Sequence, residues 1–274
     1  MQSPQHALDA KIQDYYGLGE EHARLQTRSV GGRLEFERVR RLVSAHLAPT
    51  SRILDVGGAT GIHSSWLAEA GHDVTLIDPV ATQVAAAAEV DTFEAVVGDA
   101  RSLEIPSQRV DAVLLFGPLY HLSARADRDL SLREALRVLR PGGLLVAQGI
   151  TRLTNVVDTV VHGGLDAVRH ELLDILRTGG WANESDGFPG GHLHTVAELR
   201  EEIEQSGFGG VQVHGLEGPN LGALEMIPAD DEILGHAVQL VEAAEARVRG
   251  TGIGEDLLAG YSPHLLAIAT APQP

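Results

Sequence analysis

The chain has 274 residues and a formal charge of −17, from 21 basic and 38 acidic side chains. A field of that sign repels phosphate backbones, so we expect no nucleic-acid partner. The densest basic stretch, residues 38–41, is interpreted as the solvated face of a helix. The absence of cysteine excludes disulfides, thiolate zinc sites and a cysteine nucleophile. The polar N-terminus lacks the apolar core of a signal peptide, and no run is long enough to span a membrane, which predicts a cytoplasmic protein without membrane contact.

Apolar spacing predicts a helical start followed by alternating strands and helices. Val39, Leu42, Val43 and Leu47 recur at intervals of three and four, which places them on one helix face. Seven strands are then expected, at residues 52–56, 73–78, 93–97, 110–116, 144–147, 211–213 and 264–271. This order predicts an α/β fold: a Rossmann-like, seven-stranded, mostly parallel sheet with helices on both faces, plus a helical cap.

The alternation of strands and helices ends after the fifth predicted strand. Residues 152–178 predict one or two amphipathic helices, and residues 179–194 a glycine-rich loop. Thr195 then opens a helix with the spacing of a capping box. A long helix is expected from about Asp230 to Arg249.

A glycine-rich turn follows the first predicted strand and runs from Asp55 through Gly57, Gly58 and Ala59 to Gly61. Glycine has no Cβ, so a ligand can approach the backbone of such a turn closely. The dinucleotide fingerprint has a glycine where this chain has Ala59, and that difference disfavours a cofactor with a pyrophosphate. The turn therefore indicates a nucleotide-like ligand other than NAD.

Acidic residues close the next two predicted strands. Asp78 ends the second strand, where a carboxylate can accept hydrogen bonds from both hydroxyls of a ribose. Asp99 follows the third strand. With Asp55 at the end of the first strand, three carboxylates stand at the ends of successive strands, which is an improbable arrangement without a bound ligand.

These residues resemble the motifs of class I methyltransferases that use S-adenosylmethionine (SAM). The turn is similar to their acidic-x-Gly-x-Gly-x-Gly motif with Ala59 in place of the middle glycine, and Asp99 matches the position that contacts the adenine amino group. Residues 139–143 (Leu-Arg-Pro-Gly-Gly) resemble a turn found in many small-molecule enzymes of this class. Residues 116–122, after the fourth strand, are similar to the UbiE/COQ5 group of small-molecule methyltransferases.

The resemblance implies SAM as cofactor, with S-adenosylhomocysteine (SAH) as product, and a site built from the strand ends. The cofactor contacts that it implies are Asp55, Gly57, Gly58, Ala59, Gly61, Asp78, Pro79, Asp99, Ala100, Phe116 and Gly117. Arg33 is a candidate partner for the methionine carboxylate, and a surface pair with Glu35 or Glu37 is the alternative. The chain then divides into an N-terminal helical cap (1–48), a SAM-binding core (49–150), a helical and loop insertion that forms an acceptor lid (151–194) and the C-terminal half of the sheet (195–274).

Methyl transfer is an in-line displacement, so positioning supplies much of the rate, and a hydroxyl or ammonium acceptor also needs a base. His121, beyond the fourth strand, is the first candidate for that base, and packing under the cap is the alternative. Tyr16 is a candidate lid or acceptor contact, and Glu217, after the sixth strand, is a second acid–base candidate. His192 and His194 have the spacing of a metal pair, but without cysteine or a clear third ligand we expect no metal.

The sequence thus predicts a SAM-dependent methyltransferase for a small-molecule acceptor, methylated on oxygen, nitrogen or carbon, in secondary metabolism. An indole-containing cyclodipeptide, methylated on nitrogen or carbon, is the specific hypothesis. A nicotinamide-dependent oxidoreductase is one alternative, disfavoured by Ala59 and by the lack of a Tyr-x-x-x-Lys pair. A non-catalytic SAM-binding protein is the other. The cap helices could also be exchanged between the subunits of a homodimer.

Overall fold

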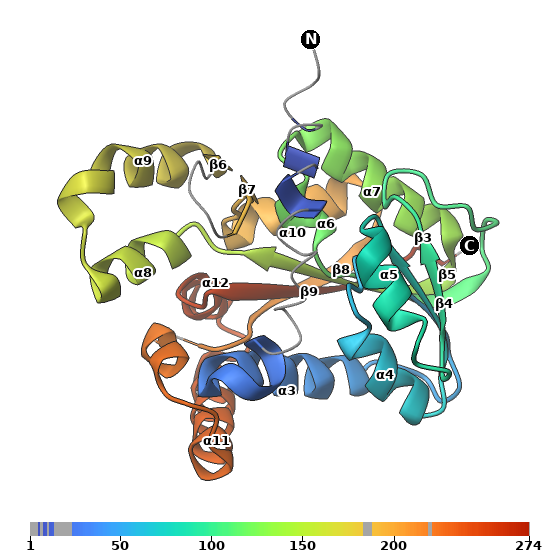
Figure 1. The fold of residues 1–274 in the computed structure, drawn as a ribbon, viewed down its shortest axis with the longest axis horizontal. Helices are drawn as coiled ribbons and strands as arrows, with labels where there is room; N and C mark the ends of the chain where they lie inside the picture. The colour runs from blue at the N-terminus through green and yellow to red at the C-terminus, as the bar shows by residue number, and fades with distance from the viewer. Residues whose placement is uncertain are drawn as a thin grey trace.

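The computed structural model describes residues 5, 8, 9, 11–13, 24–182, 188–218 and 221–273 (Figure 1). Seven strands form one sheet in the order β3-β2-β1-β4-β5-β9-β8, in which β9 runs opposite to the other six. They are β1 (Arg52–Val56), β2 (Asp73–Asp78), β3 (Glu94–Val97), β4 (Val110–Leu115), β5 (Leu139–Ile150), β8 (Gly209–Gly215) and β9 (His264–Thr270). The predicted Rossmann-like, mostly parallel sheet is confirmed.

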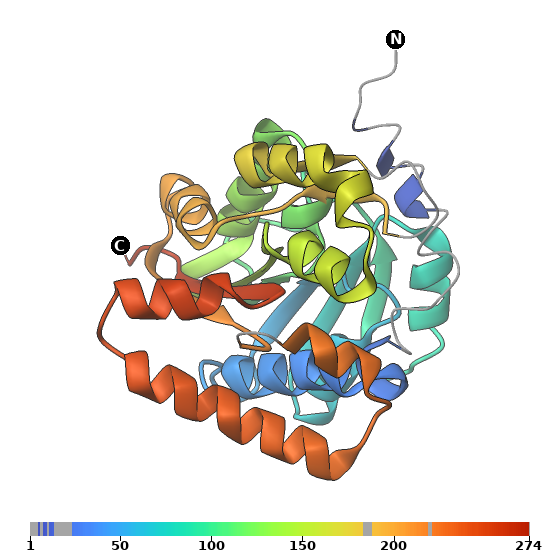
Figure 2. The same ribbon diagram turned by 90° about the vertical axis from the view of Figure 1, so that its left-hand side faces the viewer.

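Helices cover both faces of this sheet (Figures 1 and 2). The helices are α3 (Val30–Ser44), α4 (Ile62–Glu69), α5 (Ala81–Ala87), α6 (Pro118–His121), α7 (Arg125–Val138), α8 (Thr154–His162), α9 (Leu165–Thr178), α10 (Val196–Gln205), α11 (Asp231–Val248) and α12 (Ile253–Gly260), with a short π-helix η1 (Arg24–Arg28) and a short 3-10 helix η2 (Leu221–Met226). Helices α3 and α4 pack on one face, and α7, α10 and α12 on the other. No described helix has the length and apolar character that crossing a bilayer requires.

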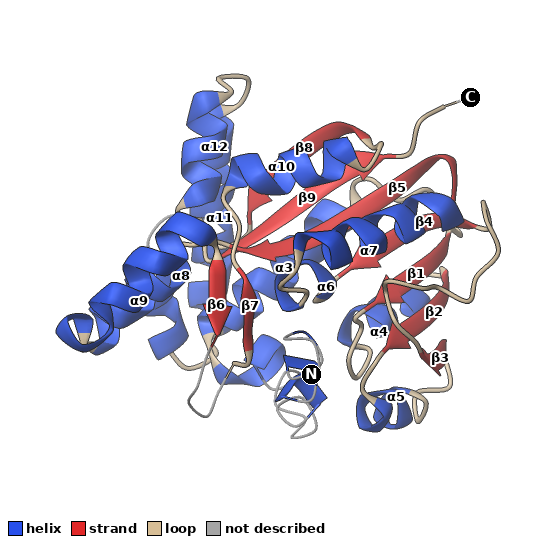
Figure 3. Ribbon diagram, turned by 90° about the horizontal axis from the view of Figure 1, so that it is seen from above, coloured by secondary structure: helices blue, strands red, loops and turns tan. Residues whose placement is uncertain are grey.

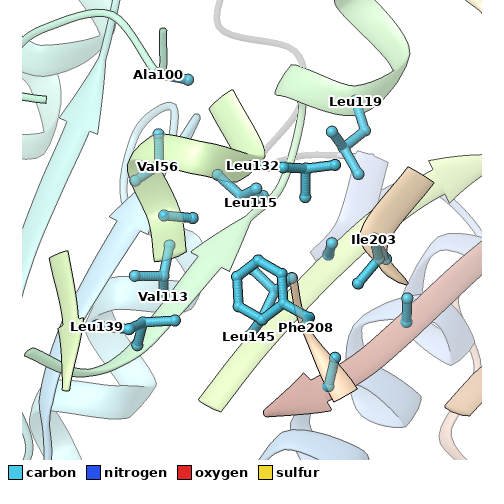
Figure 4. Close-up of a cluster of buried hydrophobic side chains, with 14 of the residues drawn as sticks. Val56, Ala100, Val113, Leu115, Leu119, Leu132, Leu139, Leu145, Ile203 and Phe208 are labelled. Carbon is cyan, nitrogen blue, oxygen red and sulfur yellow. The ribbon is translucent and has the colours of Figure 1, made fainter. Parts of the chain in front are cut away.

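Strand β4 is apolar almost throughout because both of its faces are buried. Side chains alternate along a strand, so Val113 and Leu115 face the helices α7 and α10 while Ala112 and Leu114 face α3 and α4. Figure 4 shows the first of these cores, in which Leu132 of α7 lies beside the strand residues. Burying one such leucine stabilises the fold by roughly 1.5–3 kcal/mol.

The predicted apolar face of the first helix is confirmed in α3, where Val39 and Val43 are buried. The neighbouring basic stretch is not uniformly solvated, and that part of the interpretation is wrong. Arg38 is only 2% exposed, because α11 packs along α3 and brings Glu245 to 2.5 Å from the guanidinium. A sequence alone does not show that a distant helix will supply this carboxylate.

The region expected to be a glycine-rich loop contains a short hairpin, β6 (Gly180–Ala182) paired antiparallel with β7 (Gly190–His192) (Figure 3). Three-residue strands rich in glycine have no apolar alternation, so no periodic signal predicts them. Gly191 has a φ of +144°, and a Cβ there would lie 1.9 Å from the carbonyl oxygen of Tyr120. The hairpin therefore lies directly against α6, and only glycine permits the contact.

Candidate active site

A cavity of about 240 Å³ opens at the carboxyl ends of the parallel strands, the usual ligand site of an open α/β sheet. Many predicted site residues line it, namely Gly57, Gly58, Ala59, Asp78, Pro79, Asp99, Ala100, Phe116, Gly117 and His121. Four other predicted residues, Asp55, Gly61, Arg33 and Glu217, are not part of its lining. Tyr16 lies outside the described residues.

The turn after β1 requires its first and last glycines. Gly57 has a φ of +81°, and a Cβ there would lie 2.3 Å from the carbonyl oxygen of Phe116. Gly61 has a φ of +84° and would meet the ring of Phe93 at 2.4 Å. Ala59 also adopts a positive φ, +50°, although it carries a side chain. The chain thus keeps the backbone path of a three-glycine turn with an alanine in a conformation that L-residues rarely adopt.

Asp78 holds this turn in place. Its carboxylate accepts hydrogen bonds from the backbone N–H of Ala59 at 2.9 Å and of Val80 at 2.8 Å. Burial raises the pKa of Asp78, and these two hydrogen bonds oppose that rise. Because each carboxylate oxygen has a second lone pair, the group can brace the turn and still accept a hydrogen bond from a ribose in the cavity.

Asp55 supports the turn from below. Its side chain is fully buried and accepts a hydrogen bond from the hydroxyl of Ser64 at 2.7 Å. Its other oxygen, Oδ1, has no hydrogen-bonding partner in the described part of the chain. Burial raises the pKa of Asp55 to about 6. The carboxylate lies behind the cavity wall, so the structure gives it a role in shaping the turn.

Arg101 joins the third strand end to the N-terminal segment. It donates to Asp99 at 2.5 Å and lies 3.7 Å from Asp9, which also lines the cavity. Burial alone would raise the pKa of Asp99, but the hydrogen bonds from Arg101 outweigh it and lower that pKa. Gln5 adds a second tie, since its side-chain oxygen accepts from Ser123 at 2.9 Å. Described residues of the N-terminal segment therefore form one wall of the cavity.

His121 lies at the cavity, where the sequence placed it. His121 is half-buried, and its ring stacks on Phe188 with centroids 5.2 Å apart, while Phe188 stacks on Trp181 of β6 at 5.5 Å. Burial lowers the pKa of His121 to about 3, and a hydrogen bond with the backbone of Gly190 offsets this only in part. The imidazole is therefore neutral at pH 7 and is a weak base in this environment.

The structure does not bring Arg33 to the cavity, so its assignment to the methionine carboxylate is corrected. Arg33 pairs instead with Asp231, at 2.6 Å, at the start of α11. Glu217 does lie at the expected end of the sheet, yet it is buried behind the wall. It accepts from Ser262 at 2.6 Å and pairs with the ring of His264.

Three residues that sequence patterns missed also line the cavity: Glu35, His63 and Gln148. The carboxylate of Glu35 accepts from Arg24 at 2.7 Å and from Gln148 at 2.7 Å, and lies 3.4 Å from His264. Burial would raise the pKa of Glu35, but Arg24 and His264 lower it to about 2. Helix periodicity gave no signal for Glu35, because a charged residue near a helix start is ordinarily solvated.

The two carboxylates Glu35 and Glu217 act together on His264, which lies between them. Burial alone would lower the pKa of His264, but their charges raise it to about 9. The ring is therefore protonated at neutral pH and bridges two anions. Glu217 consequently reaches the cavity only through His264 and Glu35.

The histidine pair in the insertion has a third neighbour that the sequence did not reveal. His192, His194 and Glu202 are buried together, close enough for one atom of each to approach a shared ion. The guanidinium of Arg128 already donates to both oxygens of Glu202, at 2.9 and 2.7 Å. A metal ion would have to break this buried ion pair, which costs free energy. The absence of a metal at this cluster therefore stays a prediction.

Part of this chain is similar in sequence to known methyltransferases. Residues 54–147 match the family model described as a methyltransferase domain. An uncharacterized methyltransferase of Mycobacterium bovis is 34% identical over 99 residues, which cover 36% of this chain and 39% of that protein. A demethylmenaquinone methyltransferase of Mycolicibacterium vanbaalenii is 32% identical over 116 residues, covering 42% and 49%. The matches thus span less than half of each relative.

Similarity of fold extends further than similarity of sequence. A SAM-dependent methyltransferase of Methanosarcina mazei superimposes with a TM-score of 0.57 over 85% of this chain and 98% of its own, at 17% identity. At that identity the likeness concerns the fold. It extends beyond residues 54–147, the part that matches the family model, but leaves 15% of the chain uncovered.

Proposed function

We propose that this chain is a class I methyltransferase, an enzyme that transfers a methyl group from SAM to a small-molecule acceptor. One observation carries the proposal. The glycine turn and two strand-end carboxylates, Asp78 and Asp99, line the same cavity as Glu35 and His121. This supports a nucleoside subsite and an acceptor subsite within one space.

The residues at the nucleoside end fit SAM. The backbone from Gly57 to Ala59 lines the cavity, Asp78 can accept from ribose hydroxyls, and Asp99 can accept from the adenine amino group. No pyrophosphate needs to fit, which agrees with an alanine at position 59. When bound, SAM supplies a methyl group activated by its sulfonium.

The chain's own contribution is position and exclusion of water. Orientation of two reactants can supply roughly 7–11 kcal/mol of the barrier. The ties of Gln5 and Asp9 to the cavity rim hold a wall over the site, and the His121–Phe188–Trp181 stack forms another. His121, neutral and a weak base, is suited to orient an acceptor by a hydrogen bond.

For the acceptor we propose a small organic molecule of secondary metabolism, with an indole-containing cyclodipeptide methylated on nitrogen or carbon as the specific hypothesis. Aromatic residues support it. They are 4% of the chain, yet Phe116 and Tyr120 line the cavity and Phe188 and Trp181 stack behind it. Planar acceptors bind well against such rings.

A thermal-shift titration with SAM, SAH and NADH side by side tests the cofactor. A ligand at about 100 times its dissociation constant stabilises the fold by roughly 2.7 kcal/mol, which raises the melting temperature measurably. We expect a rise with SAM and SAH and none with NADH. A rise with NADH alone would replace the proposal with a nicotinamide-dependent oxidoreductase.

Turnover is tested by mass. Tryptophan-containing cyclodipeptides are incubated with SAM, and the expected product is about 14 mass units heavier, the mass of one added methylene. His121→Ala should lower turnover more than it lowers SAH affinity. SAH binding without product across a broad acceptor panel would indicate a non-catalytic SAM-binding protein. The predicted homodimer is tested separately by light scattering on the purified protein.

A further inference from the structure

Two side chains of the cavity wall each have one polar atom that makes no hydrogen bond to the described part of the protein. His63 of α4 and Gln148 of β5 both line the cavity. Each makes one side-chain hydrogen bond, through Nδ1 and Nε2 respectively. Their other polar atoms, Nε2 of His63 and Oε1 of Gln148, have no partner among the described residues, and neither is fully buried. These atoms are therefore open to a bound molecule.

The free atom of His63 is a donor, because a tryptophan fixes the tautomer of the ring. The indole Nε1 of Trp66 lies 3.3 Å from Nδ1 of His63, and an indole N–H only donates. Nδ1 must therefore carry the lone pair, which leaves the proton on Nε2. Phe36 and Phe116 pack on the ring, with centroids 5.4 and 4.8 Å away, and hold it in place. Burial lowers the pKa of His63 to about 4, so the ring is neutral.

The free atom of Gln148 is an acceptor, because a carboxylate fixes the amide orientation. The nearest oxygen of Glu35, which is ionised, lies 2.7 Å from the amide and can only accept a hydrogen bond. The NH₂ group must therefore face Glu35, which turns Oε1 the other way. Arg24 and His264 hold Glu35 in turn. The amide cannot flip without losing this bond.

We propose that His63 and Gln148 bind the methyl acceptor as a neutral donor and acceptor pair, and that the acceptor therefore presents a carbonyl beside an N–H or O–H, as the edge of a cis-amide or lactam does. The inference rests on the proposed function, since it takes the bound molecule to be the methyl acceptor. Glu35 and Trp66 are positioning residues for this pair. Gln148 donates to Glu35 at 2.7 Å, and the charge of the same carboxylate acts on the His63 ring, so both side chains belong to the part of the wall formed by α3, α4 and β5.

The amino-acid end of SAM, the proposed cofactor, is a poorer match for His63 and Gln148. The amino-acid end of SAM carries a full positive and a full negative charge, and charged groups bind most strongly to charged partners. His63 and Gln148 are neutral, and the nearby cation Arg24 is already paired with Glu35. A neutral amide edge satisfies both free atoms without leaving a charge unpaired.

Binding of small lactams tests the inference without requiring turnover. The SAH-saturated protein is titrated with 2-piperidone, which has the N–H and C=O on one edge, and with N-methyl-2-piperidone, which lacks the N–H. Nitrogen-15 NMR of the His63 ring reports the site directly. We expect 2-piperidone to shift the Nε2 resonance and to bind at least tenfold more tightly than its N-methyl analogue.

Variants separate the acceptor from the cofactor. His63→Phe and Gln148→Leu should each weaken 2-piperidone at least fivefold while the SAH dissociation constant changes less than twofold. His46→Phe and Gln205→Leu are matched controls, because both residues are exposed and Gln205 also donates to a glutamate. Trp66→Phe should broaden or shift the Nδ1 signal as the second tautomer becomes populated.

Any of three results overturns the inference. Equal affinity for both lactams, or no binding of either, would show that the pair does not recognise an amide edge. A loss of SAH affinity with lactam binding unchanged would assign the pair to the cofactor. Absence of methyl transfer to any acceptor, with lactam binding as expected, would instead overturn the proposed function.

Discussion

The buried carboxylate of Asp55 should make this protein less stable as the pH rises through the weakly acidic range. Its side chain is fully buried, with one hydrogen bond from Ser64, and its pKa is raised from 3.8 to about 6. Between these two values the folded state binds a proton that the unfolded state has released. Stability must therefore fall as the pH rises through this window.

The magnitude follows from the shift. A rise of about two pKa units corresponds to roughly 3 kcal/mol of the free energy of unfolding. Below about pH 4 the folded protein keeps this stability, and it loses it as the pH rises from about 4 to about 6. Asparagine resembles the protonated acid and does not titrate. Asp55→Asn should therefore match the wild type near pH 4 and exceed it by up to about 3 kcal/mol above pH 7.

Urea unfolding from pH 4 to pH 8 measures this difference. Subtracting the variant from the wild type removes the contributions of all other titrating groups that the change leaves alone. Ser64→Ala should move the pH window upward, because it removes the hydrogen bond that favours the charged form. A difference that stays constant with pH would refute the reasoning.

Three further predictions concern packing around the site. Gly57→Ala should lower the free energy of unfolding by roughly 2–5 kcal/mol and weaken SAH binding in a titration. The reason is that the new Cβ would meet the carbonyl of Phe116, at a residue with a positive φ. An unchanged melting temperature would contradict the turn geometry. Ala59→Gly should be neutral or stabilise by up to roughly 1 kcal/mol in urea unfolding, since relief of the left-handed conformation offsets the extra unfolded entropy. Glu202→Gln should lower the free energy of unfolding by roughly 3–5 kcal/mol in the same assay, because it leaves the charge of Arg128 buried and uncompensated. Replacing both residues with leucine or methionine should restore much of that loss. Equal losses in the single and double variants would contradict this explanation.

The sheet could be predicted from the sequence because each strand and helix leaves a local, repeated pattern of apolar residues. Strand β4 is apolar along its length, and the stripe of Val39 and Val43 has the period of a helix. The glycine turn was predictable for a related reason. A backbone path with positive φ at Gly57 and Gly61 restricts the residue type at each position, so the conformation leaves a trace in the sequence.

The second half of the site left no such trace. Glu35 and Gln148 are 113 positions apart and meet only because α3 packs over the end of β5. Arg33 was equally ambiguous, since its partner Asp231 comes from α11, a helix whose packing on α3 no local pattern reports. A long-range ion pair is chosen by tertiary packing, and a single charged residue on a helix carries no information about which distant element will cover it.

The reversed direction of β9 has a consequence for how the site is completed during synthesis. Because β9 runs antiparallel to β5, its first residue, His264, arrives at the cavity end of the sheet beside Glu35. These two residues are separated by roughly 230 positions, so at about 5–20 residues per second the ribosome adds the second some 10–45 s after the first. A nascent chain can form the glycine turn long before it can pair the Glu35 carboxylate. Until β9 has been synthesised, the Glu35 carboxylate lacks its imidazolium partner, His264, and the part of the cavity wall that contains Gln148 is incomplete.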